Sequence, residues 1–372
     1  MLAIMKAIRL AASGGLERLK LVELPDPPAP RADEIQVRIQ GSSLNFHDYA
    51  VARFDAPHTV ERIPLADGAG VVEATGTGVT EFAPGDTVVS TFFPQWLSGQ
   101  PLNGDFSTVP GDGVDGYARE RVVRPATWFT RAPRNWTAAE SATLTTAGVT
   151  AWRALIGDGA LKAGDTVLVL GTGGVALFGL QLAKAMGATV IITSSSDDKL
   201  ARARAAGADH TVNYRTTADW GAAVLKLTQG RGVDQVLELG GPGTLPQSIT
   251  ACRIGGQISL IGTLTGSAGQ IPTSALMRRQ VRLQGLIVGS RAQQQQLINA
   301  MDSTGIRPVI DRRFPLAGLA DAFRYQESNQ HFGKICLEYY GGLRPSGHSS
   351  HRLAWARRVP ASVAAASPVP QK

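Results

Sequence analysis

The sequence predicts an α/β protein, in which a doubly wound parallel sheet follows a strand-rich first domain. Three consecutive patterns carry this prediction. Val167 to Leu170 is an unbroken apolar run that stops at glycines, as in a strand buried on both faces. Apolar residues then recur at helical spacing, at Val175, Phe178, Leu182 and Met186, until Gly187 ends the segment. Val190 to Ile192 supplies a second strand, so the stretch is a β-α-β unit.

The turn of this unit reads Gly171-Thr172-Gly173-Gly174-Val175-Ala176. Gly171 permits a tight turn, Gly173 lets the backbone approach a pyrophosphate, and the small Ala176 allows the helix to pack on the strand. The free N–H groups at the helix start would face phosphates. A purely structural glycine turn is the alternative, but the flanking strands and helix favour a dinucleotide site. We therefore predict cofactor contacts from Gly171, Thr172, Gly173, Gly174 and Val175.

Composition sets the class of protein. The chain has 372 residues, enough for two domains, and 43% of them are hydrophobic. No apolar run approaches the roughly 20 residues of a membrane span, and residues 1–30 show no secretory pattern. We expect a cytoplasmic protein without a membrane partner. The two cysteines, Cys252 and Cys336, cannot form a four-cysteine zinc site and are expected to be buried apolar residues.

The net charge of +7 comes mainly from the end of the chain. Residues 341–372 carry five basic residues and no acidic one, which leaves 32 basic and 30 acidic residues elsewhere. The segment is rich in Pro, Ser, Ala and Arg and lacks apolar periodicity, so it is predicted to be a disordered basic tail. A contact with an anionic surface is the alternative role. No nucleic-acid partner is expected, since the body of the chain is nearly neutral.

Residues 1–130 are rich in strand patterns and punctuated by Pro and Gly, which predicts a β-barrel-like domain. The expected strands are Lys6–Leu10, Leu19–Glu23, Glu34–Ile39, Gly70–Ala74, Thr87–Ser90 and Tyr117–Val123.

From Thr137 the pattern changes to alternating helices and strands. Thr137 and Glu140 match a capping box before a helix over Ala142–Leu155. The remaining predicted helices are Asp197–Ala206, Ala218–Thr228, Gly243–Arg253, Ala292–Ser303 and Leu316–Glu327. The remaining strands are Thr211–Asn213, Asp234–Leu239, Gln257–Ile261, Val281–Val288 and Lys334–Tyr339.

This order of elements resembles the medium-chain dehydrogenase/reductase superfamily over residues 5–340. The local stretches that carry the resemblance are Ser43–Asp48, Ala66–Gly70, Thr146–Trp152, Val233-Asp234 with Glu238, and Gly333-Lys334. The resemblance implies a GroES-like β-barrel catalytic domain over residues 1–130 and 292–340. It also implies a Rossmann NADP-binding domain over residues 131–291.

The zinc-dependent branch of that superfamily holds its catalytic metal with a Cys where this chain has Ser43 or its neighbours. It also uses a Gly-His-Glu motif where this chain reads Asp67-Gly68-Ala69. A structural zinc would need four cysteines between about residues 90 and 115, and Ser90–Asp115 contains none. The sequence is therefore similar to the zinc-independent branch, which includes NADPH:quinone reductases and enoyl and enone reductases. No metal ligand is predicted.

The catalytic candidates are Asn45, His47, Asp48 and Tyr49, after the Glu34–Ile39 strand. Asn45 matches the Asn of the zinc-free pattern and could donate its amide to a substrate carbonyl. For His47 and Asp48 a structural role stays open: Asp48 could cap the following helix, and His47 could point to solvent.

The cofactor is expected to be NADP(H). An NAD-binding unit places an acidic residue about 20 positions past the first glycine. Here the strand ends instead with Ser194 and Ser195, which are assigned to cofactor binding because their hydroxyls can donate hydrogen bonds. In zinc-free relatives a lysine corresponding to Lys199 contacts the 2′-phosphate, and Tyr214 could close that pocket. Asp197 turning back to the ribose is the contrary possibility. Further cofactor contacts are assigned to Thr146, Thr150, Gly240 and Gly262.

Together these features predict hydride transfer from NADPH to a quinone or conjugated carbonyl compound. An alcohol dehydrogenase or aldehyde reductase acting on a simple carbonyl is one alternative, and a low-turnover NADPH-binding protein is another. We also expect a homodimer, because Val281–Val288 is an apolar strand at the end of the sheet order and such an edge is usually paired or covered.

Overall fold

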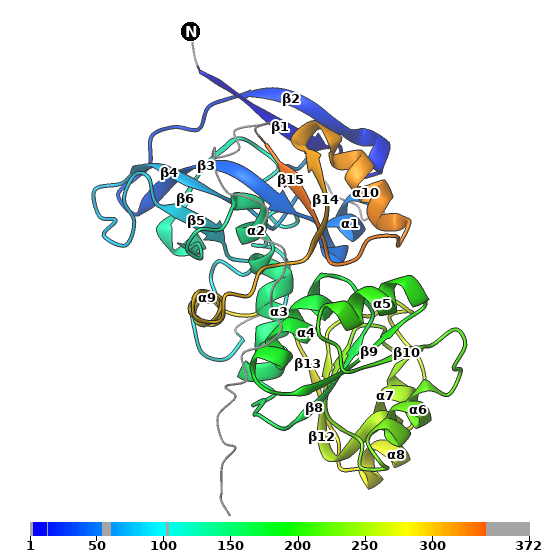
Figure 1. Cartoon of the computed structure of the whole chain (residues 1–372). Helices are drawn as coiled ribbons and strands as arrows, with labels where there is room; N and C mark the ends of the chain where they lie inside the picture. The colour runs from blue at the N-terminus through cyan, green and yellow to red at the C-terminus, as the bar shows by residue number, and fades with distance from the viewer. Residues whose placement is uncertain (1–2, 13, 54–60, 102–103, 340–372) are drawn as a thin grey trace, which may run out of the picture. The chain divides into compact units, whose positions relative to one another are not determined.

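The computed structural model describes residues 3–12, 14–53, 61–101 and 104–339. These residues lie in one unit, Met1–Tyr340, and the tail predicted to be disordered lies outside the described residues. Figure 1 shows a strand-rich part formed by the first strands together with the last ones, and a part built around a parallel sheet.

The parallel sheet has six strands in the order β10-β9-β8-β11-β12-β13, all parallel to their neighbours. Their bounds are β8 (Thr166–Leu170), β9 (Thr189–Ser194), β10 (His210–Asn213), β11 (Val233–Glu238), β12 (Cys252–Leu260) and β13 (Arg282–Gly285). The order reverses after β8, since β9 and β10 lie on one side of it and β11 to β13 on the other. This doubly wound arrangement confirms the predicted fold class.

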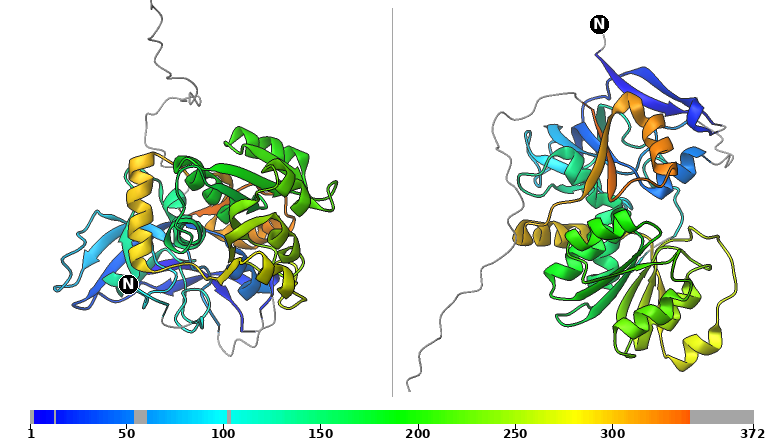
Figure 2. Two further views of the ribbon diagram at one scale, coloured as in Figure 1. Left: turned by 90° about the horizontal axis from the view of Figure 1, so that it is seen from below. Right: turned by 45° about the vertical axis from the view of Figure 1, so that its right-hand side comes forward.

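Helices cover both faces of this sheet because side chains alternate along each strand (Figure 2). Val167 and Val169 of β8 pack into one hydrophobic cluster, and Leu168 and Leu170 pack into another. The first face is covered by α3 (Val149–Trp152), α4 (Gly174–Ala185) and α5 (Asp197–Ala205). The second face is covered by α6 (Trp220–Leu227), α7 (Leu245–Ala251) and α8 (Thr273–Arg278).

The strand-rich part is built on a seven-stranded sheet, β14-β15-β3-β4-β5-β7 with β6 also paired to β3, and a separate β1-β2 ribbon. The bounds are β1 (Ile4–Leu10), β2 (Leu19–Pro25), β3 (Glu34–Ser43), β4 (Ala69–Thr75), β5 (Thr87–Ser90), β6 (Arg121–Pro125), β7 (Phe129–Arg131), β14 (Ile310–Pro315) and β15 (Lys334–Glu338). The chain returns to this sheet at its end, because Cys336 of β15 lies opposite Ser43 of β3 (Figure 1). The division into domains at residues 130/131 and 291/292 stays a prediction.

The remaining helices join or flank the two sheets. They are α1 (Phe46–Arg53), α2 (Ala138–Ala142), α9 (Arg291–Thr304) and α10 (Leu319–Glu327), with short single turns at Leu16–Arg18, Ala126–Trp128, Leu144–Gly148, Arg153–Gly157 and Leu316–Gly318. The predicted capping box is present, since Thr137 and Glu140 bond each other's backbone N–H groups. No helix in the described part of the chain has the length and apolar character needed to cross a bilayer.

Some predicted elements differ from the structure. Only Arg282–Gly285 of the predicted strand Val281–Val288 pairs, since β12 ends at Leu260 and offers no further partner. The predicted helix Gly243–Arg253 ends at Ala251, because Cys252 already pairs with Val233 in the sheet.

Further elements were shifted or missed in the sequence, among them β7 and α8, for which no element was predicted. The strand expected over Tyr117–Val123 is placed at Arg121–Pro125, where it pairs with β3. The charged strand β14 was not predicted, because its pairing with β15 depends on residues that follow it in the chain.

Candidate active site at the phosphate turn and the Asp67–Lys334 cluster

The predicted turn over residues 171–176, which we call the phosphate turn, links β8 to α4 at the point where the strand order of the sheet reverses. Gly171 has φ +77°, a left-handed conformation that favours glycine. Gly173 precedes the first helical residue and no side chain caps the helix there, although a backbone bridge joins Gly173 to Gly333 beside it. A Cβ placed on Gly173 would have no atom within 4 Å. The turn therefore has the open backbone cradle that a pyrophosphate requires.

The other predicted glycines lie at the same edge of the sheet, after the carboxyl ends of β11 and β12. Gly240 N donates to Glu238 Oε1 at 2.8 Å, and Gly241 N donates to the same oxygen at 3.0 Å. Gly262 N donates to the Glu238 carbonyl at 3.3 Å. Glu238 is fully buried, and its other oxygen accepts from the Ser248 hydroxyl. This carboxylate shapes the turn at Gly240, a role that was not predicted from the sequence.

Polar side chains end β9, where NAD-binding units carry an acidic residue. Ser194 is buried and its hydroxyl accepts from Ser196 N at 3.3 Å. The Asp197 carboxylate accepts from Asn213 Nδ2 at 2.8 Å. Tyr214, whose N–H donates to the Ser194 carbonyl at 3.1 Å, is exposed. The structure thus brings Ser194, Asp197 and Tyr214 to one corner of the sheet.

Lys199 lies in the first turn of α5, beside this corner. Its Nζ donates to the Asn329 carbonyl in the segment that leads into β15. Burial lowers the pKa of Lys199, while Asp311 raises it and Arg202 lowers it further. A cofactor phosphate that used Lys199 would have to compete with Asn329.

Asp67 is the centre of a buried cluster in the strand-rich part. It is fully buried, and its carboxylate accepts from the Ser43 hydroxyl and from Thr146 Oγ1, the latter at 2.6 Å. Lys334 Nζ lies 3.6 Å from Asp67 Oδ2. The Thr150 hydroxyl donates to the Thr146 carbonyl at 2.6 Å, which ties Thr150 to the turn of helix on which Thr146 lies.

Asn45 joins this cluster through Lys334 and Asp48. Lys334 Nζ donates to Asn45 Oδ1 at 2.6 Å, and Asn45 Nδ2 donates to Asp48 Oδ2 at 3.0 Å. Asp48 also accepts from Asn45 N and Ala66 N, both at 2.9 Å. Burial raises the pKa of Asp48, and Asp67 adds to this rise, whereas His47 and the bonds from Ala66 and Asn45 oppose it. We call Ser43, Asn45, Asp48, Asp67, Thr146 and Lys334 the Asp67–Lys334 cluster.

The alternative roles of Asp48 and His47 have different outcomes. Asp48 does cap a helix, but it does so from inside the first turn. The helix α1 begins at Phe46, and the Asp48 carboxylate accepts a hydrogen bond from the N–H of Asn45, the residue before it. His47 does not point to solvent. Its ring lies 4.7 Å from the Phe106 ring and 5.4 Å from the Phe92 ring, measured between centroids. His47 Nε2 is 3.3 Å from Asp112 Oδ2, close enough for an ion pair but without the alignment of a hydrogen bond.

Tyr49 lies apart from the cluster. Its hydroxyl donates to Glu327 Oε1 at 3.0 Å, and its ring contacts Phe46 and Phe323. Burial raises the pKa of Tyr49, and the bond to Glu327 adds to the rise. The Tyr49 side chain therefore supports the packing of α1 against α10, and its link to Asn45 is the backbone bond from Tyr49 N to the Asn45 carbonyl at 3.2 Å.

An aromatic wall forms beside His47 from the segment after β5. The buried rings of Phe92 and Phe93 pack edge to face at 4.9 Å, and Phe106 stacks 6.4 Å from Phe93. The sequence did not single out these rings, because their packing depends on the path of the loop.

The described residues contain no group of three or more His, Cys, Asp or Glu side chains arranged to hold a metal ion. Independence from zinc stays a prediction. Cys252 and Cys336 are free and buried, as expected, and burial raises the pKa of each thiol to about 12.

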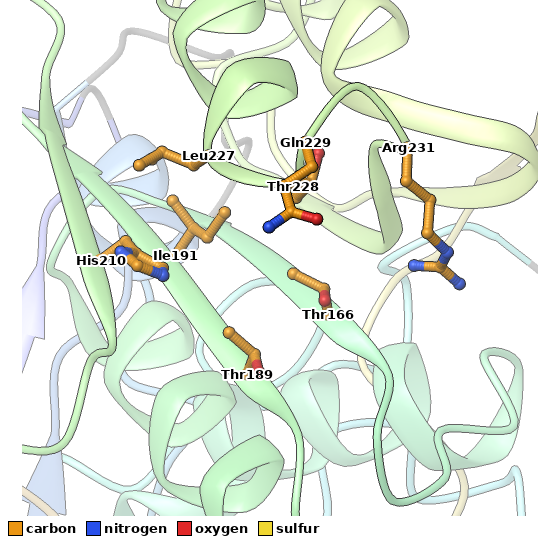
Figure 3. Close-up of a pocket in the computed structure, with 8 residues that line it drawn as sticks. All are labelled: Thr166, Thr189, Ile191, His210, Leu227, Thr228, Gln229 and Arg231. Atoms are coloured by element: carbon orange, nitrogen blue, oxygen red, sulfur yellow. The ribbon is translucent and has the colours of Figure 1, made fainter.

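A separate hollow of about 160 Å³ lies at the amino ends of β8 and β9, at the edge of the sheet opposite the phosphate turn (Figure 3). Its lining residues are Thr166, Thr189, Ile191, His210, Leu227, Thr228, Gln229 and Arg231. Arg231 is engaged with Asp234 at 2.7 Å. Since the side chains of the Asp67–Lys334 cluster do not line it, we assign the hollow no role in catalysis.

Comparisons with known proteins agree with this arrangement. The profile of the alcohol dehydrogenase GroES-like domain matches residues 31–134, and the profile of the zinc-binding dehydrogenase matches residues 174–303. A zinc-type alcohol dehydrogenase-like protein of Schizosaccharomyces pombe is 38% identical over 333 residues, which cover 87% of this chain and 96% of that protein.

Solved structures give the same result. A Sinorhizobium meliloti 1021 protein described as an alcohol dehydrogenase is 42% identical, with a TM-score of 0.83, and the match covers 91% of this chain and all of that one (100%). An NAD-dependent alcohol dehydrogenase is 33% identical, with a TM-score of 0.81, over 90% of this chain and 100% of its own. The phosphate turn, the six-stranded parallel sheet beside a strand-rich part, and these relatives together show that the chain belongs to the medium-chain dehydrogenase/reductase superfamily and is an NAD(P)-dependent oxidoreductase.

Proposed function

We propose that this oxidoreductase transfers a hydride from NADPH to a quinone or a conjugated carbonyl compound without the help of a metal ion. The observation that carries the proposal is the Asn45 amide, fixed between Lys334 and Asp48 at the start of α1. An amide N–H can donate to a carbonyl oxygen as negative charge develops on it, which lowers the barrier to hydride transfer. When bound, the nicotinamide supplies the hydride itself.

The aromatic wall supports a conjugated substrate. His47, two residues along the chain from Asn45, packs its ring against Phe92 and Phe106. Phe92 is buried, whereas His47 and Phe106 are part-exposed. Flat conjugated molecules stack well on aromatic rings, which favours quinones and enones over small aliphatic carbonyls. Among similar proteins, a 2-haloacrylate reductase of Burkholderia sp. is 28% identical over 330 residues and acts on a conjugated acid by name.

The end of β9 supports NADPH. Ser194 and Ser195 stand where an NAD-binding unit needs a carboxylate, and the Asp197 carboxylate is engaged by Asn213. Lys199 and Tyr214 flank the same corner and can provide a cation and a hydroxyl to a 2′-phosphate. A 2-octenoyl-CoA carboxylase reductase solved with NADP is 25% identical to this chain, with a TM-score of 0.81.

A simple carbonyl is the second candidate substrate, because a Geobacillus stearothermophilus relative that is 29% identical over 316 residues is an alcohol dehydrogenase.

The test is NADPH oxidation against matched sets of quinones, enones and saturated aldehydes of similar size. A higher kcat/KM for the conjugated members supports the proposal. A preference for saturated aldehydes supports the alcohol dehydrogenase alternative. Tight NADPH binding without turnover on any compound would indicate a low-turnover NADPH-binding protein instead of a reductase.

We also propose a homodimer that pairs the free edge of β13. Among the described strands β13 contacts β12 alone, and apolar side chains nearby are exposed, including Ile254, Leu264, Met277 and Ile287. An open strand edge with apolar neighbours favours pairing with a second copy. Light scattering at micromolar concentration should give twice the 39.2 kDa chain mass, and the mass of a single chain would contradict the proposal.

A further inference from the structure

We propose that Lys334 is a positioning residue that fixes the orientation of the Asn45 amide and strengthens it as a donor. The proposal rests on the role given to Asn45 under the proposed function. Lys334 begins β15 and is only 3% exposed. Its Nζ donates to the Leu44 carbonyl and to Asn45 Oδ1, each at 2.6 Å.

The charges on either side of Asn45 allow one orientation of its amide. Oδ1 faces the Lys334 ammonium, and Nδ2 faces the Asp48 carboxylate. If the amide were rotated by half a turn, its NH₂ group would face the ammonium and its oxygen would face the carboxylate. Both contacts would then be repulsive in a site where Asn45 is nine-tenths buried. Lys334 and Asp48 together therefore exclude the flipped amide.

The fixed amide has one strong donor left for a substrate. Asp48 takes one of the two Nδ2 hydrogens, which leaves the second. The ammonium on Oδ1 draws electron density from the amide, and such hydrogen-bond chains make the far N–H a better donor. Lys334 thus acts on the reacting carbonyl through Asn45, without touching it.

Lys334 also contacts the phosphate turn. Gly333 N donates to the Thr172 carbonyl at 2.9 Å, and a Cβ on Gly174 would come within 2.5 Å of Lys334 Cδ. The aliphatic stem therefore packs on the start of α4 while the ammonium holds Asn45. The same side chain fixes the distance between the part that binds the cofactor phosphates and the part that polarises the substrate.

If Lys334 had only a structural role, that role would be to neutralise the buried charge of Asp67. Without Lys334, Asp67 would still accept hydrogen bonds from Ser43 and Thr146, so it would keep two donors. Lys334→Met keeps the length of the stem and removes the charge. Lys334→Gln keeps a neutral hydrogen-bond donor. It replaces Lys334→Met in the comparison with the wild type if the Met variant unfolds.

The test is a double-mutant cycle on the substrate that the wild type reduces fastest. Lys334→Met should lower kcat by about 10- to 100-fold, with a smaller change in KM for NADPH, because a displaced polarising group acts on the transition state. In the Asn45→Ala background the same change should lower kcat less than threefold. Lys162→Met, a change on the surface at a residue paired with Asp165, is the matched control and should leave kcat unchanged.

Two results would overturn the proposal: independent losses of kcat that multiply in the double variant, or a loss confined to KM for NADPH. A measurement that does not depend on turnover can test the positioning role of Lys334 separately from the proposed function. The side-chain ¹⁵N–¹H signals of Asn45, assigned with Asn45→Ala, should show two well-separated hydrogens in the wild type and should move in Lys334→Met. Unchanged signals would refute the positioning role even if the substrate proposal stands.

Discussion

The phosphate turn and the Asp67–Lys334 cluster use the backbone and the side chains in opposite ways. The turn is nearly free of functional side chains, and its chemistry comes from N–H groups, a positive φ at Gly171 and the open space at Gly173. The cluster depends on side chains, since the buried Lys334 ammonium lies beside the Asp67 carboxylate and is linked to the Asp48 carboxylate through Asn45.

The two regions also differ in how far apart their parts lie in the sequence. The turn is a run of consecutive residues, whereas the bond from Lys334 to Asn45 spans 289 residues and that from Thr146 to Asp67 spans 79. A local backbone site tolerates change in its surroundings, while a side-chain network fails as a unit. The difference suggests that cofactor binding and substrate activation can be impaired separately.

The largest expected effect tests the cluster. Asn45→Ala should lower kcat by roughly 10- to 1000-fold while cofactor affinity changes little, because it removes a donor to the developing oxyanion. Steady-state kinetics and NADPH titration measure the two quantities. An unchanged kcat would transfer the polarising role elsewhere, with His47 the next residue to test.

The next effect tests the cofactor corner of the nucleotide sheet. Lys199→Ala should weaken NADPH binding roughly 10- to 150-fold and leave NADH nearly unaffected, since a charge-assisted hydrogen bond contributes about 1.5 to 3 kcal/mol. The bond from Lys199 to the Asn329 carbonyl must break first, which favours the lower end of this range. Equal losses for both cofactors, or a wild-type preference for NADH, would show that the assignment is wrong.

A pair of glycine variants separates folding from binding within the turn. Gly171→Ala should lower the free energy of unfolding by about 1 to 2 kcal/mol, the usual cost of a left-handed residue with a side chain. Gly173→Ala should change stability by less than about 0.5 kcal/mol, since its Cβ meets open space, yet weaken both NADPH and NADH. Denaturant unfolding and cofactor titration distinguish the two. Unaltered cofactor affinity in Gly173→Ala would place the pyrophosphate elsewhere.

The last prediction concerns metal removal, for which we expect no change in the reaction rate. Prolonged treatment with a chelator should leave the rate unchanged, because neither the Asp67–Lys334 cluster nor the phosphate turn has a set of metal ligands. Metal analysis of the purified protein accompanies the assay. Stoichiometric zinc whose removal abolishes activity would contradict this prediction.

The nucleotide-binding part could be predicted from the sequence to the level of individual strands. Its signals are local: apolar runs such as Val167–Leu170, glycines at turns, and the period of α4. The cluster could be predicted only in part. Asn45 and Asp48 were recognised, but the buried roles of Asp67 and Lys334 were not, because their partners come from distant segments. The one local signal was a lysine at the start of the apolar strand β15.

The position of β15 also has a consequence for how the protein is made. This strand pairs with β3 on one side and with β14 on the other, so the seven-stranded sheet is incomplete until the last described residues are present. During synthesis the parallel sheet can form first, because its strands follow one another in the chain. Until β15 is made, the edge of β3 that pairs with it stays open. Loop closure over so long a separation is slow. The Asp67–Lys334 cluster is therefore among the last parts of the molecule to assemble, and a chain that ended before β15 could form the parallel sheet but would lack Lys334.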